Sequence, residues 1–143
     1  MQERVTTAGI LTMGDKFFIA KRQDSGSIGG LWEFPGGKNR YTETEAETLI
    51  REFDEELGLQ IEVGQLLHEH DFINKDTVYH LKAYLVTAKE HQEYKLSVHT
   101  EYRWVSLKQL SEYQFAPSDQ EIVKTLQSKC FTDQEIIEKL QLR

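Results

Sequence analysis

The feature that most constrains the fold is an amphipathic helix predicted over residues 42–57, between two strand-like regions. Thr42 and Glu45 match a capping box, in which the two side chains satisfy backbone N–H groups at the helix start. Gly58 follows the segment directly and favours a C-terminal stop. The apolar residues recur at helical spacing and form one stripe: Ala46, Leu49, Ile50, Phe53 and Leu57. The segment therefore predicts a helix with one face on a core.

Strand-like segments surround this helix. Alternating and β-branched apolar residues predict strands over 5–12, 17–20, 61–72, 77–88 and 101–106. A second helix is expected from Ser118, with Glu121 as its capping partner, and a third over 132–142. This order indicates an α/β fold with a mixed sheet and helices on both faces. At 143 residues we expect one domain over 1–143, with 129–143 as an extra C-terminal helix.

The composition excludes several classes of partner. Lys and Arg number 17 and Asp and Glu 24, so the net charge of −7 argues against nucleic-acid polymers and acidic lipids, which bind basic faces. A phosphate-ester substrate would therefore need recruited cations. The single cysteine, Cys130, excludes an internal disulfide and a multi-thiolate zinc site. With no apolar run of membrane-spanning length and no hydrophobic signal region, we expect no membrane contact and a cytoplasmic location.

The acidic residues of the predicted helix have a spacing that indicates a bound cation. Glu52 and Glu56 are four residues apart, and Glu55 is three residues from Glu52, so three carboxylates share one side. Like charges at this spacing repel unless a cation lies between them. Carboxylate oxygens suit Mg²⁺ or Mn²⁺, which commonly bind substrate phosphates as well. A solvated outer face is the alternative interpretation, and Arg51 is placed to pair with Glu55.

The segment LWEFPGGK, residues 31–38, precedes this helix. Gly36 and Gly37 allow a ligand to approach the backbone closely, and Lys38 adds a positive charge beside them. Such a turn next to a carboxylate cluster suits a metal-bound pyrophosphate. A plain turn is the alternative.

Together these residues resemble the Nudix box, which reads G, five residues, E, seven residues, then REUxEExGU with U apolar. Here the box begins at Gly37, passes through Glu43 and Arg51, and ends at Gly58 and Leu59. Phe53 stands where the family usually has Ile, Leu or Val. LWEFPGGK resembles the MutT-like nucleoside-triphosphate branch. The resemblance covers most of residues 5–128 and implies a Nudix-type α/β/α sandwich.

The resemblance implies a hydrolase, active in nucleotide-pool sanitation, that cleaves a standard or modified (d)NTP to a nucleoside monophosphate and pyrophosphate. It implies Mg²⁺ as cofactor, with Mn²⁺ as a substitute. Metal ligands would come from the side chains of Glu52, Glu55 and Glu56 and the carbonyl of Gly36. Arg51 and Glu43 would support the helix and its loop. The catalytic set also includes Glu101, which competes with Glu52 for the role of general base.

The substrate residues follow from the same resemblance. Arg22 matches a phosphate-contacting position, and Gly37 and Lys38 adjoin the phosphates. Phe34 would line the base site, with a core role as the alternative. Asp119 would accept a hydrogen bond from a cytosine or guanine N–H, with helix capping as the alternative. Ser27 stands where members specific for oxidised guanine carry histidine, which counts against 8-oxoguanine.

Other interpretations of the sequence remain open. One is a Nudix hydrolase of ADP-ribose or a dinucleoside polyphosphate, although no proline lies between Pro35 and Pro117, where ADP-ribose enzymes typically have one. Another is a non-catalytic nucleotide-binding regulator, which the intact acidic residues argue against. The five histidines lack metal-ligand spacing and are interpreted as surface or packing residues. Both a monomer and a homodimer are compatible with the sequence.

Overall fold

The computed structural model describes residues 1–23, 29–89 and 92–128. The elements are β1 (Gln2–Met13), β2 (Lys16–Arg22), β3 (Trp32–Glu33), β4 (Gly36–Lys38), α1 (Glu45–Leu57), β5 (Ile61–Asn74), β6 (Thr77–Ala88), β7 (His99–Val105), the 3-10 helix η1 (Lys108–Glu112) and α2 (Pro117–Ser128). Ser27, Cys130 and the helix expected over 132–142 lie outside the described residues. None of the described helices is long and apolar enough to cross a membrane.

The strands form the predicted mixed sheet. Its main path is β3–β2–β1–β6–β5, with β4 paired to β1 and β7 paired to β2. β1 and β6 run parallel, with Thr6 opposite Leu81, and the other pairings are antiparallel. Parallel neighbours need a long connection between them, and the chain between β1 and β6 contains α1.

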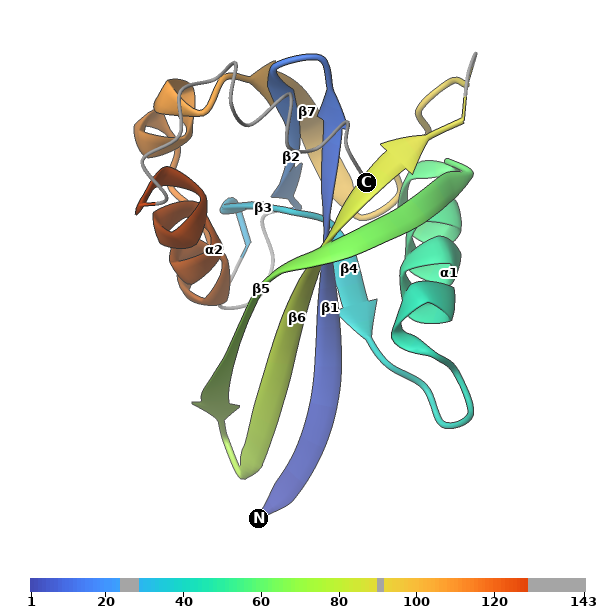
Figure 1. The fold of residues 1–143 in the computed structure, drawn as a ribbon, viewed down its shortest axis with the longest axis vertical. Helices are drawn as coiled ribbons and strands as arrows, with labels where there is room; N and C mark the ends of the chain where they lie inside the picture. The colour runs from blue at the N-terminus through green and yellow to red at the C-terminus, as the bar shows by residue number, and fades with distance from the viewer. Residues whose placement is uncertain (24–28, 90–91, 129–143) are drawn as a thin grey trace.

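Two helices cover opposite faces of the sheet, which confirms the expected α/β/α arrangement (Figure 1). The core on the α1 side contains Leu11 and Phe53, and the core on the α2 side contains Ile10 and Ile122. Successive residues of β1 thus point to different cores, because side chains alternate along a strand. The sheet is buried on both faces where the helices pack.

Helix α1 begins later than the sequence predicts. Its N-cap is Thr44, whose hydroxyl accepts from Glu47 N at 3.1 Å while the Glu47 carboxylate accepts from Thr44 N at 2.8 Å. The predicted capping box at Thr42 and Glu45 is therefore wrong. Thr42 has φ +73°, in the left-handed region, whereas an N-cap residue is typically extended.

The apolar stripe of α1 is narrower than predicted. Leu49, Phe53 and Leu57 are buried at successive intervals of four residues. Ile50 is 40% exposed, because it lies off that line. At the C-terminus Gly58 adopts φ +67° and donates its N–H to Asp54 O at 2.9 Å, which confirms the predicted stop.

Other boundaries shift where pairing extends an element. β7 begins at His99, two residues before the predicted strand, because His99 pairs with Arg22 on β2. Helix α2 begins at Pro117, a residue suited to the first turn, so Ser118 lies inside the helix and the predicted capping box with Glu121 is wrong. The earlier start of β7 matters most for the site, because it makes His99 part of the sheet, where its side chain is buried.

Candidate active site

Arg51 connects the loop after β4 to helix α1. Its Nε donates to Glu43 Oε2 at 2.6 Å and its Nη2 to Glu43 Oε1 at 3.1 Å, a bidentate pair. Its Nη1 donates to Glu52 Oε1 at 2.7 Å and to Glu55 Oε2 at 3.4 Å. The pairing with Glu55 that the spacing predicts is thus the longest of these contacts. The hydrogen bond from Arg51 lowers the pKa of Glu43 to about 2.

Glu52 and Glu56 lie together on the inner side of α1. Gly37 of β4 makes room for Glu52, because a Cβ at Gly37 would lie only 2.5 Å from Glu52 Cδ. The Glu52 carboxyl group lies close enough to that of Glu56, which is 5% exposed, to affect its pKa. Glu56 Oε1 has no hydrogen-bond partner among the described residues. Burial, with Glu52 and Glu33 nearby, raises the pKa of Glu56 well above its usual range.

This pair of carboxyl groups fits a divalent cation. The two acids are held close although they repel when ionised, and one buried oxygen is unsatisfied. Oxygen donors of this kind are those that Mg²⁺ and Mn²⁺ prefer. Gly36 precedes Gly37 on β4, and it is Gly37 that lies directly against Glu52. Glu52, Glu56 and the Gly36 carbonyl would hold the ion.

Two further residues complete this buried region, and sequence reasoning missed both. His99 Nε2 lies 2.8 Å from Glu33 Oε2 and 3.7 Å from Glu56 Oε1. One ligand atom from each of the three residues lies within 4.8 Å of the others. The His99 side chain is fully buried, and its Nδ1 has no hydrogen-bond partner among the described residues.

A sequence signal for these residues did exist. Glu33 lies inside the LWEFPGGK segment, where the Pro and Gly residues indicate a turn and give no sign of a buried acid. His99 precedes Glu101 by two positions, so strand alternation would place both on one face. What the sequence does not provide is the pairing of β7 with β2, which includes a register shift between Lys21 and Arg22.

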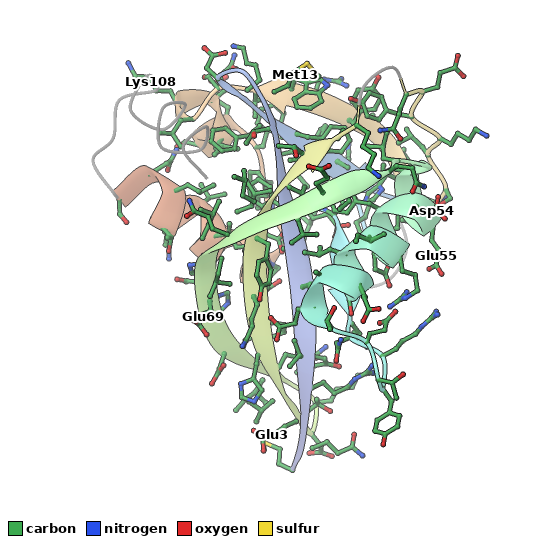
Figure 2. The ribbon with its side chains drawn as sticks, turned by 45° about the vertical axis from the view of Figure 1, so that its right-hand side comes forward. Glu3, Met13, Asp54, Glu55, Glu69 and Lys108 are labelled. Carbon is green, nitrogen blue, oxygen red and sulfur yellow. The ribbon has the colours of Figure 1, made fainter. Side chains whose placement is uncertain are left out.

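Glu55 and Glu101 lie differently from the other predicted acids. Glu55 is 50% exposed and its carboxylate faces Arg51 and Arg40. Figure 2 shows Glu55 and its neighbour Asp54 projecting from the outer side of α1. Glu101 is 37% exposed and contacts Lys21 at 3.9 Å and Arg103 at 3.1 Å. The structure therefore groups Glu52 and Glu56 with Glu33 and His99, while Glu55 and Glu101 pair with basic side chains.

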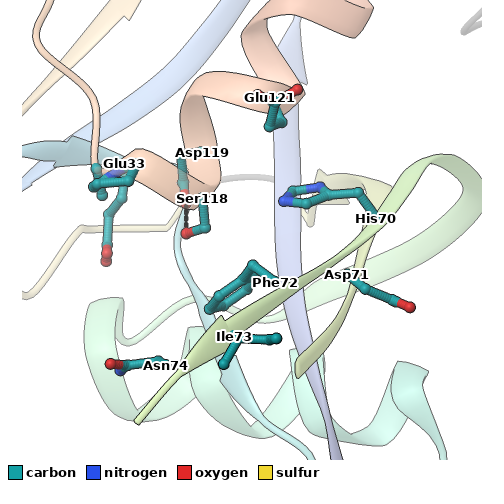
Figure 3. Close-up of a pocket in the computed structure, with 11 residues that line it drawn as sticks. Glu33, His70, Asp71, Phe72, Ile73, Asn74, Ser118, Asp119 and Glu121 are labelled. Carbon is teal, nitrogen blue, oxygen red and sulfur yellow. Dashed lines mark hydrogen bonds between the residues drawn. The ribbon is translucent and has the colours of Figure 1, made fainter. Parts of the chain in front are cut away.

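A cavity of about 400 Å³ opens beside β4, and all five predicted substrate-binding residues line it. Its lining includes Arg22, Phe34, Gly36, Gly37, Lys38 and Asp119, together with the rings of Phe72 and Tyr79. A second cavity of about 670 Å³ shares Glu33, Phe72 and Asp119 with the first. In Figure 3 the ring of Phe72 points from β5 toward Ser118 at the start of α2. The two cavities are thus lined by both aromatic and charged side chains.

Asp119 and Phe34 are tied to each other. Asp119 Oδ2 accepts from Phe34 N at 2.7 Å, and Ser118 Oγ donates to Asp119 Oδ1 at 3.1 Å. Burial raises the pKa of Asp119 to about 7. Phe34 is 3% exposed and stacks on Phe115 with ring centroids 5.4 Å apart, so it contributes to the core as well as to the cavity. The carboxylate of Asp119 therefore fixes the chain between β3 and β4.

Two basic side chains lie at the same cavity. Arg22 Nη1 is 3.4 Å from Glu33 Oε2, and its side chain is 33% exposed. Lys38 is exposed and its Nζ lies 5.4 Å from the centre of the Tyr79 ring. Both retain donors for an anionic ligand. A chain with net charge −7 thus presents positive charge beside the carboxyl pair.

Comparisons with known proteins agree with this geometry. A model of the NUDIX domain family matches residues 6–125. The chain is 32% identical over 112 residues to the CTP pyrophosphohydrolase of Escherichia coli K12, covering 78% of this chain and 82% of that protein. It is 32% identical over 122 residues to the putative 8-oxo-dGTP diphosphatase 2 of Mycobacterium tuberculosis H37Rv, covering 83% and 84%.

Solved structures show the same fold. The solution structure of the E. coli ORF135 protein matches with a TM-score of 0.78 and 28% identity, over 90% of this chain and 91% of that one. The MutT protein from Methanosarcina mazei Go1 matches with a TM-score of 0.74 and 21% identity, over 92% and 97%.

The family match and the named relatives define a hydrolase of the Nudix class. The chain belongs to the NUDIX family and is a Nudix pyrophosphohydrolase, as the resemblance implied.

Proposed function

We propose that this chain is a Mg²⁺-dependent nucleoside triphosphate pyrophosphohydrolase, which releases a nucleoside monophosphate and pyrophosphate. The observation that carries the proposal is the buried contact between Glu52 and Glu56, with one unsatisfied oxygen, beside a cavity that contains Arg22 and Lys38. A triphosphate is strongly anionic, so it needs both the basic side chains and a cation.

The roles of the side chains follow from their contacts. Arg51 occupies Glu52 Oε1, which leaves Glu52 Oε2 to accept the proton of the attacking water. Arg22 and Lys38 would hold the phosphate oxygens, with Arg22 able to bind two of them. When bound by Glu52 and Glu56, Mg²⁺ would supply positive charge against the phosphates and make water more acidic. The water oxygen forms the new bond to phosphorus, and the anhydride bond to pyrophosphate breaks.

Base selection is assigned to the cavity at Asp119. Its carboxyl oxygens can accept an N–H donor from a base, and the rings of Phe72 and Tyr79 offer apolar contact. The relatives are named for CTP and for 8-oxo-dGTP, and both bases present N–H groups. With a pKa of about 7, Asp119 is partly protonated at neutral pH and then also donates. Cytosine and guanine nucleotides are therefore the first substrates to compare.

The test is a pyrophosphate-release assay over standard, oxidised and methylated nucleoside triphosphates, with Mg²⁺, with Mn²⁺ and with EDTA. ADP-ribose and a dinucleoside tetraphosphate serve as competing substrates, with their own products assayed. We expect release from at least one triphosphate with Mg²⁺ and none with EDTA. Much faster cleavage of ADP-ribose or the dinucleoside tetraphosphate, or binding without turnover of any nucleotide, would contradict the proposal.

A further inference from the structure

We propose that Glu33, Glu56 and His99 form a second divalent-cation site, with mixed oxygen and nitrogen ligands, that selects Zn²⁺ over Mg²⁺. The site shares only Glu56 with the carboxyl pair of the proposed function. It uses a buried histidine and a glutamate that the hydrolysis described above does not require.

Both carboxylates approach the same ring nitrogen, with Glu33 Oε2 at 2.8 Å and Glu56 Oε1 at 3.7 Å from His99 Nε2. Zinc–ligand bonds of about 2.0–2.2 Å in a tetrahedral arrangement place ligand atoms about 3.4 Å apart. The two separations from His99 Nε2 bracket that value, and the ligand atoms of Glu33 and Glu56 lie within 4.8 Å of each other. An ion could therefore bind if the two carboxylates moved to meet it.

Glu56 Oε1 and His99 Nδ1 are buried, and neither has a hydrogen-bond partner among the described residues. The side chains of His99, Glu56 and Glu33 are 0%, 7% and 12% exposed, so solvent reaches them poorly. An ion bound at Nε2 and Oε1 would satisfy the glutamate oxygen, so Glu56 Oε1 is the atom that supports the proposal, whereas His99 Nδ1 would stay without a partner among the described residues. Buried polar groups without partners are rare in proteins, and an unseen ion is one recognised explanation.

Two carboxylates and a neutral imidazole balance the charge of a divalent ion, and binding would release any proton they carry. Imidazole nitrogen is a good ligand for Zn²⁺, whereas Mg²⁺ prefers oxygen. Arg22 lies 3.4 Å from Glu33 Oε2, the oxygen that also faces His99, so the Arg22 guanidinium would have to move to Glu33 Oε1 when an ion binds at Oε2. The imidazole nitrogen therefore favours Zn²⁺ over Mg²⁺, although both ions carry the same charge.

The chain contains a matched control. His80 also contacts two carboxylates, but Asp71 lies at its Nδ1 and Glu3 at its Nε2. These acids approach opposite sides of the ring, and both are more than half exposed. One ion cannot bind a single His80 nitrogen together with both acids. A His80→Gln variant thus disrupts a cluster of similar composition in which the two acids do not approach the same ring nitrogen.

The direct experiment is a Zn²⁺ titration of the whole chain with ¹⁵N-labelled histidine, followed by the ring-nitrogen NMR signals. We expect one imidazole to show a metal-bound Nε2, with these signals lost in His99→Gln and kept in His80→Gln. The same signals should not move with Mg²⁺. No change of any ring nitrogen at saturating Zn²⁺, or a response that persists in His99→Gln, would overturn the proposal.

A second variant protects the test against misfolding of His99→Gln. Glu33→Gln leaves the ring in place and removes a charged ligand, so the Kd for Zn²⁺ should rise at least about tenfold. An unchanged Kd would also overturn the proposal. Mg²⁺-dependent pyrophosphate release by the wild-type chain is measured separately, so loss of the Zn²⁺ site would leave the proposed function standing.

Discussion

Two histidines of this protein each contact two carboxylates, and the contrast between them separates a functional cluster from a surface one. His80 lies on β6, and one acid lies at each of its ring nitrogens, at 2.7 and 2.8 Å. At His99, both acids lie at Nε2, and the ring is fully buried. Each cluster combines one histidine with two carboxylates. Burial and the direction of approach decide which cluster can hold an ion.

The two clusters also differ in what they do for the fold. The His80 cluster joins β1, β5 and β6 and titrates in solvent, so it acts as a weak, pH-dependent link. The His99 cluster lies between β3, α1 and β7, and it leaves polar atoms unsatisfied. Unsatisfied buried groups oppose folding, so their presence indicates a function that compensates for the lost stability. The following changes should separate the two regions by the size of their effects.

The largest effect is expected at Glu56. Glu56→Gln keeps the shape of the side chain but removes a charge that the cation needs. We expect kcat to fall by about three orders of magnitude, with folding retained, in the pyrophosphate-release assay. Asp54→Asn, on the exposed side of the same helix, is the control and should retain wild-type turnover. Near-normal turnover of Glu56→Gln would remove this residue from the mechanism.

Arg51→Lys should have the next largest effect. Lysine cannot reproduce the bidentate contact with Glu43 together with the contact to Glu52. We expect kcat/KM to fall about tenfold, because Glu52 loses its fixed position.

The stability of Arg51→Lys should also depend on pH. The folded-state pKa of Glu43 is lowered to about 2, so its interaction stabilises the fold above the ordinary glutamate pKa and is lost as the pH falls toward 2. The difference in free energy of unfolding between the wild-type chain and Arg51→Lys should therefore shrink over that window. A difference that stays constant in urea titrations across acidic pH would count against this account of Glu43.

Asp119→Asn should change stability in the opposite direction with pH. The folded-state pKa of Asp119 is raised to about 7, so ionisation of this buried acid weakens the fold as the pH rises from about 4 to 7. Asparagine keeps an acceptor for Phe34 N without the charge. At pH 8 the variant should gain about 1–2 kcal/mol in free energy of unfolding, measured by urea titration. Lower stability of the variant at every pH would contradict the assigned shift.

His80→Gln should have the smallest effect. Hydrogen bonds to Asp71 and Glu3 raise the pKa of His80, so its contribution is full below the ordinary histidine pKa and is lost as the pH rises through the folded-state value. We expect a loss of only a degree or two in Tm near pH 5, none near pH 9, and unchanged turnover. A large loss of activity would show that the exposed cluster matters to the site.

The sequence predicted what local spacing determines. The pairing of Glu52 with Glu56 and the contact of Arg51 with Glu55 follow from helical geometry, and the structure contains both. The stop at Gly58 follows from the chemistry of one residue. The mixed sheet and its two helical layers follow from the order of the segments.

What the sequence did not predict depends on pairing between distant strands. His99 reaches Glu33 because β7 and β3 both pair with β2, and the register of β7 shifts between Lys21 and Arg22. No local pattern encodes that shift. The helix start was misplaced because Thr42 and Thr44 both have a Glu three residues later, and backbone conformation decides between them.

The central claim is that Glu52 and Glu56 tolerate each other because they share a divalent ion with a polyphosphate. Anomalous diffraction from crystals grown with Mn²⁺ and a non-hydrolysable nucleoside triphosphate analogue tests it most directly. The account predicts a manganese peak bonded to Glu52 and Glu56, with the phosphates of the analogue on the same ion. A bound analogue located elsewhere, with no manganese at either carboxylate, would contradict it.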